Sequence, residues 1–104
     1  MASTRSPDGA SDDVPQAPRV VLYFGTGCHL CETAASKLVE LREELGFELV
    51  EIPIDGDREL EARYRELIPV VEIDGERACT YYVQPVPFRR RLAAAQAAAQ
   101  TRRL

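Results

Sequence analysis

Cys28 and Cys31, separated by two residues, are the side chains of this sequence best suited to do chemistry. They follow an apolar run at residues 20–24 and open a segment with the periodicity of an amphipathic helix. Amide groups in the first turn of a helix have no partner within the helix and carry partial positive charge, so they favour a thiolate. A thiolate is the nucleophile of disulfide exchange, and this spacing puts both sulfurs on one face, within reach of a disulfide. The pattern therefore predicts a reactive thiol pair.

The rest of the sequence alternates between strand and helix patterns that would position this pair. Strands are expected at residues 20–24, 47–54, 70–73 and 77–83, and helices from the cysteine pair to residue 45, from residue 57 to the proline at 69, and over residues 88–103. A right-handed crossover makes the first two strands parallel, and the Asp74-Gly75 turn makes the last two antiparallel. The prediction is an α/β fold of order β-α-β-α-β-β-α, with helices on both faces of a four-stranded mixed sheet.

Several single residues sharpen that prediction. Gly46 is expected to end the first helix, and Asp57 to cap the second. Pro53 fits its strand only at an edge or at the strand end. The alternation of Tyr81 and Tyr82 along the fourth strand predicts that one points to the core and the other to solvent.

Composition sets the broad class. The chain has 104 residues, enough for one domain, and its net charge of -4 argues against nucleic-acid binding. No apolar run approaches the length of a membrane span. Residues 1–18, rich in Ser, Asp, Pro and Ala, are expected to form a disordered tail without a secretory signal, before a domain at residues 19–104. Three cysteines do not suit a disulfide scaffold. Without an export signal the reducing cytoplasm is the expected compartment, and we also expect a monomer.

Three stretches together carry a resemblance to a known family. They are Tyr-Phe-Gly-Thr-Gly-Cys-His-Leu-Cys-Glu-Thr-Ala at residues 23–34, Ile-Pro-Ile-Asp at residues 52–55 and Ile-Pro-Val-Val-Glu-Ile-Asp-Gly at residues 68–75. In this order they resemble the thioredoxin fold and, at this length, the glutaredoxins. The Gly-Cys-His-Leu-Cys stretch is most similar to the bacterial glutaredoxin-like family once called domain of unknown function 836. The resemblance covers roughly residues 19–92.

The resemblance implies a role for each matching residue. Cys28 would be the exposed attacking thiolate, and the more buried Cys31 would resolve the mixed disulfide. Pro69 would be a cis proline facing the sulfur pair, leaving backbone groups of Ile68 or Val70 unpaired for a substrate peptide. The implied activity is thiol-disulfide oxidoreduction on protein or glutathione disulfides, with no required cofactor and with glutathione as a candidate reductant.

Two departures from glutaredoxins bear on glutathione. Glutaredoxins that use it usually carry a basic residue shortly before the first cysteine, where this chain has Gly25, Thr26 and Gly27. They also grip glutathione with amides and an acid after the last strand, where this chain has Pro85 and Pro87, which lack an N–H, and no Asp. Inefficient use of glutathione is therefore expected.

Other interpretations of the thiols stay open. The pair could hold a metal or an iron–sulfur cluster between two chains, or belong to a non-catalytic interaction protein. A zinc site needs four ligands, yet His29 leaves the face of the pair and Cys79 sits in the fourth predicted strand, so no metal site is expected. His29 either tunes the thiolate or is an exposed spacer. Cys79 is expected to be a small buried apolar residue, with a third redox thiol as the alternative.

Overall fold

The computed structural model describes residues 18–103 and forms four strands and three helices. Most of the tail predicted for residues 1–18 lies outside this range. In chain order the elements are β1 (Arg19–Phe24), α1 (His29–Leu45), β2 (Glu48–Pro53), α2 (Arg58–Tyr64), β3 (Val70–Ile73), β4 (Glu76–Thr80) and α3 (Pro85–Arg103). This is the predicted element order.

The four strands form one mixed sheet in the order β2-β1-β3-β4. β1 pairs in parallel with β2 and antiparallel with β3, and β3 pairs antiparallel with β4. The predicted topology is confirmed. β2 lies at an edge, where Pro53 can end a strand without removing a hydrogen bond that a central strand would need.

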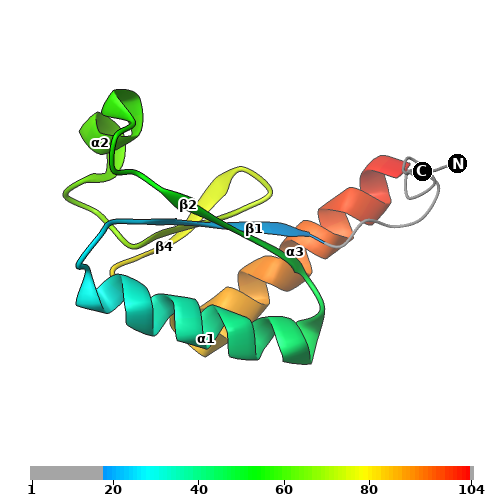
Figure 1. The fold of residues 1–104 in the computed structure, drawn as a ribbon. Coiled ribbons are helices and arrows are strands. Elements are labelled where there is room, and N and C mark those ends of the chain that lie inside the picture. Colours follow the sequence, from blue (N-terminus) through cyan, green and yellow to red (C-terminus); the bar gives the residue numbers. More distant parts are fainter. Residues whose placement is uncertain (1–17, 104) are drawn as a thin grey trace, which may run out of the picture.

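Helices cover both faces of the sheet, with α1 and α3 on one face and α2 on the other (Figure 1). The larger core lies between the sheet and the α1/α3 layer. It is formed by Val20, Leu22, Ala34, Leu38, Leu41, Phe47, Val71, Ile73, Phe88 and Leu92. The rings of Phe47 and Phe88 meet edge to face at 5.5 Å, and Arg89 of α3 donates two hydrogen bonds to the Glu44 carboxylate of α1. These contacts fix α3 against α1.

A smaller cluster supports α2 on the opposite face. Ile54, Tyr64 and Val70 are buried there, and the ring of Tyr64 lies 4.6 Å from that of Tyr23. The Tyr64 hydroxyl donates a hydrogen bond to the Glu72 carboxylate on β3. Because α2 has only seven residues, this packing rather than helix propensity holds it in place.

Three boundaries differ from the prediction. α2 ends at Tyr64, whose carbonyl accepts bonds from Leu67 and Ile68, so Pro69 does not end that helix. β4 stops at Thr80, because Tyr81 takes a left-handed conformation with φ 70°. Tyr81 and Tyr82 consequently do not alternate across a strand, and both are exposed.

The start of α3 is the third difference. The helix begins at Pro85, three residues earlier than predicted. The prediction places Pro85 and Pro87 between the last strand and the helix. A proline is tolerated in a first turn because its missing N–H would have had no partner within the helix.

Candidate active site around Cys28 and Cys31

Cys28 is the residue that caps the N-terminus of α1. Its backbone is extended, with φ -94° and ψ 107°, and its sulfur accepts a hydrogen bond from the Cys31 amide at 3.1 Å. The geometry predicted from sequence, with a sulfur facing the unpaired amides of a helix start, is therefore present. In the reduced protein the same amide and the helix dipole favour a thiolate on Cys28.

Cys31 lies one turn further into the helix. It is 3% exposed, whereas Cys28 is half-buried, and the two sulfurs form a disulfide with a Cα–Cα distance of 5.2 Å. The pair thus has an outer and an inner sulfur, as the resemblance implied. Cys28 is therefore the more accessible of the two sulfurs.

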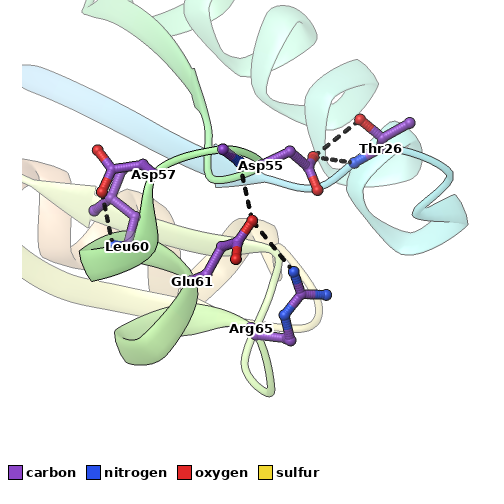
Figure 2. A network of polar contacts seen from close by, with 7 residues as sticks. Thr26, Asp55, Asp57, Leu60, Glu61 and Arg65 are labelled. Atoms are coloured by element: carbon purple, nitrogen blue, oxygen red, sulfur yellow. Dashed lines mark hydrogen bonds and ion pairs between the residues drawn. The ribbon is translucent and has the colours of Figure 1, made fainter.

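Asp55, in the loop after β2, is hydrogen-bonded to the turn that precedes Cys28. One oxygen of the Asp55 carboxylate accepts from the Thr26 amide at 2.7 Å and from the Thr26 hydroxyl at 2.9 Å (Figure 2). These bonds hold the pKa of Asp55 below its ordinary value of 3.8, so the side chain is a carboxylate at neutral pH. The neighbouring Gly56 amide donates to Glu61, which forms an ion pair with Arg65.

The role of Asp55 is a feature that the sequence patterns did not predict. A signal for it exists, because Asp55 follows β2, Gly25 and Thr26 follow β1, and the two strands are parallel. The carboxyl ends of parallel neighbouring strands lie at the same edge of a sheet, so residues just after them are brought together. The Ile54 amide, which donates to the Phe24 carbonyl at 2.9 Å, extends the strand pairing to that edge.

Pro69 and its neighbours lie beside the same turn. The Ile68–Pro69 peptide bond is cis, as the resemblance implied. A β-carbon placed on Gly25 would come within 2.7 Å of Ile68 Cδ1, so the Ile68 side chain covers the backbone of the cysteine turn. A larger residue at position 25 would therefore require the end of the Ile68 side chain to move.

The backbone around Pro69 is only partly available. The Ile68 amide donates to the Tyr64 carbonyl at 3.0 Å, and the Pro69 carbonyl accepts from the Tyr81 amide at 2.9 Å, so these two groups are already bonded. Val70 is already paired in register with Tyr23 of β1 and Thr80 of β4. Within residues 18–103 no hydrogen bond is formed to the Ile68 carbonyl.

His29 is exposed at the start of α1. Its side chain is 90% exposed, and Nδ1 lies 3.9 Å from Glu32 Oε1. The structure places it next to the cysteine pair without a buried contact, and its tuning of the thiolate stays a prediction.

Cys79, the third thiol, lies apart from the pair on β4. It is half-buried and packs against the main core, and burial raises its pKa. These features agree with a small apolar role. Among residues 18–103, no three His, Cys, Asp or Glu side chains gather in a way that could hold a metal ion. In the same part of the chain, no helix has the length and apolar character that crossing a bilayer requires.

A pocket of about 350 Å³ opens beside the disulfide. Its walls are the turn and first helical residues around the two cysteines, and its remaining surface comes from β1, α1 and β2. The lining residues are Leu22, Phe24, Gly25, Thr26, Gly27, Cys28, Cys31, Glu32, Ala35 and Glu51. Both cysteines therefore border an open space.

Residues 19–93 match the glutaredoxin-like domain family DUF836. The chain belongs to this family. Similarity to an uncharacterized protein of Mycobacterium tuberculosis, Rv0508, reaches 38% identity over 63 residues, or 56% of this chain and 65% of that relative. The match to Mb0520 of Mycobacterium bovis has the same extent. The chain thus spans just under two thirds of the length of these relatives.

Solved structures agree with the family and the fold. The solution structure of Ne2328 from Nitrosomonas europaea has 29% identity and a TM-score of 0.66, over 73% of this chain and 92% of that one. Chloroplastic thioredoxin z has 19% identity and a TM-score of 0.64, over 86% and 90% of the two chains. Fasciola hepatica thioredoxin has 20% identity and a TM-score of 0.54, over 83% and 88%. The thioredoxin fold and the glutaredoxin-like resemblance are confirmed.

Proposed function

We propose that this protein is a dithiol oxidoreductase that reduces disulfides with Cys28 and Cys31. The observation that carries the proposal is the sulfur of Cys28 at the N-cap of α1, bonded by the Cys31 amide at 3.1 Å. An amide that bonds this sulfur stabilises a thiolate more than a thiol, because hydrogen bonds to charged groups are the stronger ones. The buried sulfur of Cys31 is held next to it, ready to complete the reaction.

The reaction transfers two electrons from the pair to the substrate. The Cys28 thiolate attacks one sulfur of the client disulfide, which forms a mixed disulfide and expels the other client sulfur as a thiolate. Cys31 loses its proton and attacks the Cys28 sulfur, which forms the intramolecular disulfide seen here and expels the second client thiolate. Both client thiolates take up protons according to their pKa values. An external thiol reductant then restores the pair.

The loop at Pro69 is the proposed place for the substrate backbone. Ile68, Pro69 and Val70 lie beside the cysteine turn, with Ile68 in contact range of Gly25. Because the Ile68 amide is already bonded, we assign to the Ile68 carbonyl the role of accepting a hydrogen bond from a substrate amide. Val70 supports this loop as the first residue of β3.

The client is a protein or peptide disulfide, with glutathione as a candidate reductant of low efficiency. The prolines at positions 85 and 87 support this, because they remove two amide donors from the first turn of α3. We expect the protein to work as a monomer in the cytoplasm, a compartment reducing enough to keep such pairs as thiols.

A single-turnover assay tests the proposal whichever thiol serves as the physiological reductant. The pre-reduced protein is mixed with a glutathionylated peptide, and peptide thiol is measured for wild type, Cys28→Ser and Cys31→Ser. Wild type should release peptide thiol and form the internal disulfide. Cys28→Ser should be inactive, and Cys31→Ser should stop at a mixed disulfide. Activity that survives in Cys28→Ser would contradict the proposal.

A further inference from the structure

The pocket beside the disulfide has an apolar interior and an acidic rim. Leu22, Phe24 and Ala35 supply apolar surface next to the two sulfurs. The charged residues among those that line it are Glu32 and Glu51, and no Lys or Arg is among them. The space therefore combines a surface for methylene groups with two negative charges.

The two glutamates come from different elements. Glu32 lies in the first turn of α1, and its side chain is 75% exposed, with His29 Nδ1 at 3.9 Å from its Oε1. Glu51 lies on the edge strand β2, directly across from Leu22 in the parallel register. Side chains at such paired positions point to the same face of a sheet, so Glu51 and Leu22 share the face covered by α1.

We propose, building on the oxidoreductase function above, that this pocket binds a Lys or Arg side chain of the client polypeptide next to its reacting cysteine. The stems of these two residues are methylene chains, which pack on apolar surface while the cationic head stays in water. Here the stem would lie on Leu22, Phe24 and Ala35, and the head would meet the carboxylates of Glu32 and Glu51. The pocket thereby selects clients with basic residues beside the disulfide.

The same charges explain a poor fit for glutathione. Glutathione carries two carboxylates and one ammonium group, so its net charge is negative near neutral pH. Like charges placed opposite each other disfavour association. A site whose neighbouring pocket carries Glu32 and Glu51, in a chain with net charge -4, is better matched to a cationic partner.

The test uses three peptides that differ only in the residue next to one cysteine of an internal disulfide: Lys, Gln or Glu. Pre-reduced full-length protein reduces each peptide in a single turnover, and each rate is divided by the rate with dithiothreitol to remove intrinsic reactivity. The rates should fall in the order Lys, Gln, Glu. The Lys-to-Glu ratio should shrink as salt is raised, because salt screens exposed charges.

Variants assign the preference to the pocket. Glu51→Gln and Glu32→Gln should each reduce the Lys-to-Glu ratio about two- to fivefold, the size expected for a solvent-exposed charge pair. Glu48→Gln is the matched control, because Glu48 is an exposed glutamate on the same strand, pairs with Arg19 and does not line the pocket. It should leave the ratio unchanged. Thermal melts check that each variant is folded.

The outcomes separate the two proposals. Failure to reduce any of the three peptides would overturn the oxidoreductase function itself. Reduction at normalised rates that do not depend on peptide charge, or a ratio that neither glutamate variant changes, would overturn the cationic pocket alone. A fourth peptide, with norleucine in place of Lys, serves as a further control. If it were reduced as fast as the Lys peptide, the cationic pocket would also be overturned, since the pocket would then select only for apolar surface.

Discussion

The residues that cap the N-termini of α1 and α2 share one backbone conformation, but their side chains have different roles. Cys28 has φ -94° and ψ 107°, and Asp57 has φ -106° and ψ 103°. Each side chain accepts a bond from the amide three residues later, Cys31 at 3.1 Å and Leu60 at 3.0 Å. The Asp57 side chain satisfies an amide that has no partner within the helix, so its bond stabilises the helix. The Cys28 sulfur is an anion only as a thiolate, so in the proposed function the same bond activates it.

The N-terminus of α3 has fewer amide donors than the N-termini of α1 and α2. Its first turn contains Pro85 and Pro87 and has no acidic residue. Two amide donors are thereby absent from this turn, and an anion there would find fewer partners than at α1. The family fold thus provides three helix starts, of which α1 alone carries the sulfur pair.

Asp55 joins the first two helix starts. Its carboxylate holds Thr26 ahead of α1, while the next residue, Gly56, donates to Glu61 of α2 (Figure 2). The turn before Cys28 is therefore bonded to the loop before α2 through Asp55, not through the Asp57 cap.

The largest effect is expected when the cap of α1 is given the same side chain as the cap of α2. Cys28→Asp should abolish disulfide reduction, because a carboxylate cannot take part in disulfide exchange. It should nevertheless be more stable than Cys28→Ala by about 1 kcal/mol, the usual contribution of an N-cap acid. Activity assays and urea unfolding of the two reduced variants check this. Equal stability would show that the cap at position 28 contributes nothing to the helix.

A smaller effect is expected at the other cap. Asp57→Ala should lower the free energy of unfolding by about 1 kcal/mol, because the Leu60 amide loses its partner. The alkylation rate of Cys28 should not change. Glu59→Ala, on the same helix, is the control and should stay within about 0.5 kcal/mol of wild type. If Asp57→Ala were as stable as its control, the structural role of this cap would be refuted.

The smallest effect is expected for Asp55→Asn, which keeps the shape and removes the charge. Both hydrogen bonds from Thr26 to residue 55 should weaken, because the acceptor is no longer charged. The Thr26 amide should therefore exchange hydrogen faster, and Cys28 should react about two- to threefold more slowly. Asp57→Asn removes the same charge but keeps a good cap, and should leave Thr26 unchanged.

The pH dependence follows from the lowered pKa of Asp55. A carboxyl whose pKa is lower in the folded state contributes stability above its unfolded pKa and loses it as pH falls through the folded pKa. Wild type should therefore be more stable than Asp55→Asn at neutral pH. The difference should begin to shrink near the ordinary Asp value of 3.8 and vanish only below the lowered pKa of the folded protein. A difference that persists in strong acid would rule out the carboxylate as its source.

Local signals were sufficient to predict most of the fold. The start of α1 at the cysteine pair, the Asp57 cap and the end of α1 at Gly46 each depend on residues within one turn. Gly46 has φ 75°, a conformation that glycine adopts without a steric cost. The edge position of Pro53 followed from its missing N–H.

The remaining features depend on contacts between distant residues. Asp55 and Thr26 are 29 positions apart, and their pairing arises from the parallel register of β1 and β2. The left-handed conformation of Tyr81 is supported by its bonds to Pro69 and Glu66, which sequence periodicity does not report. The Ile68 amide is bonded within the turn after α2, a stretch that sequence periodicity assigns to the helix itself.

In the proposed function, the start of α1 makes Cys28 the reactive thiol. The most direct test is the alkylation rate of each cysteine in the reduced protein as a function of pH, with each site resolved by mass spectrometry. Cys28 should react fastest at pH about 6, with an apparent pKa in the range of about 3.5–7.5 found for activated thiols. Cys79, whose pKa is raised by burial, should react only at higher pH. Equal rates for Cys28, Cys31 and Cys79 at pH about 6 would contradict the claim.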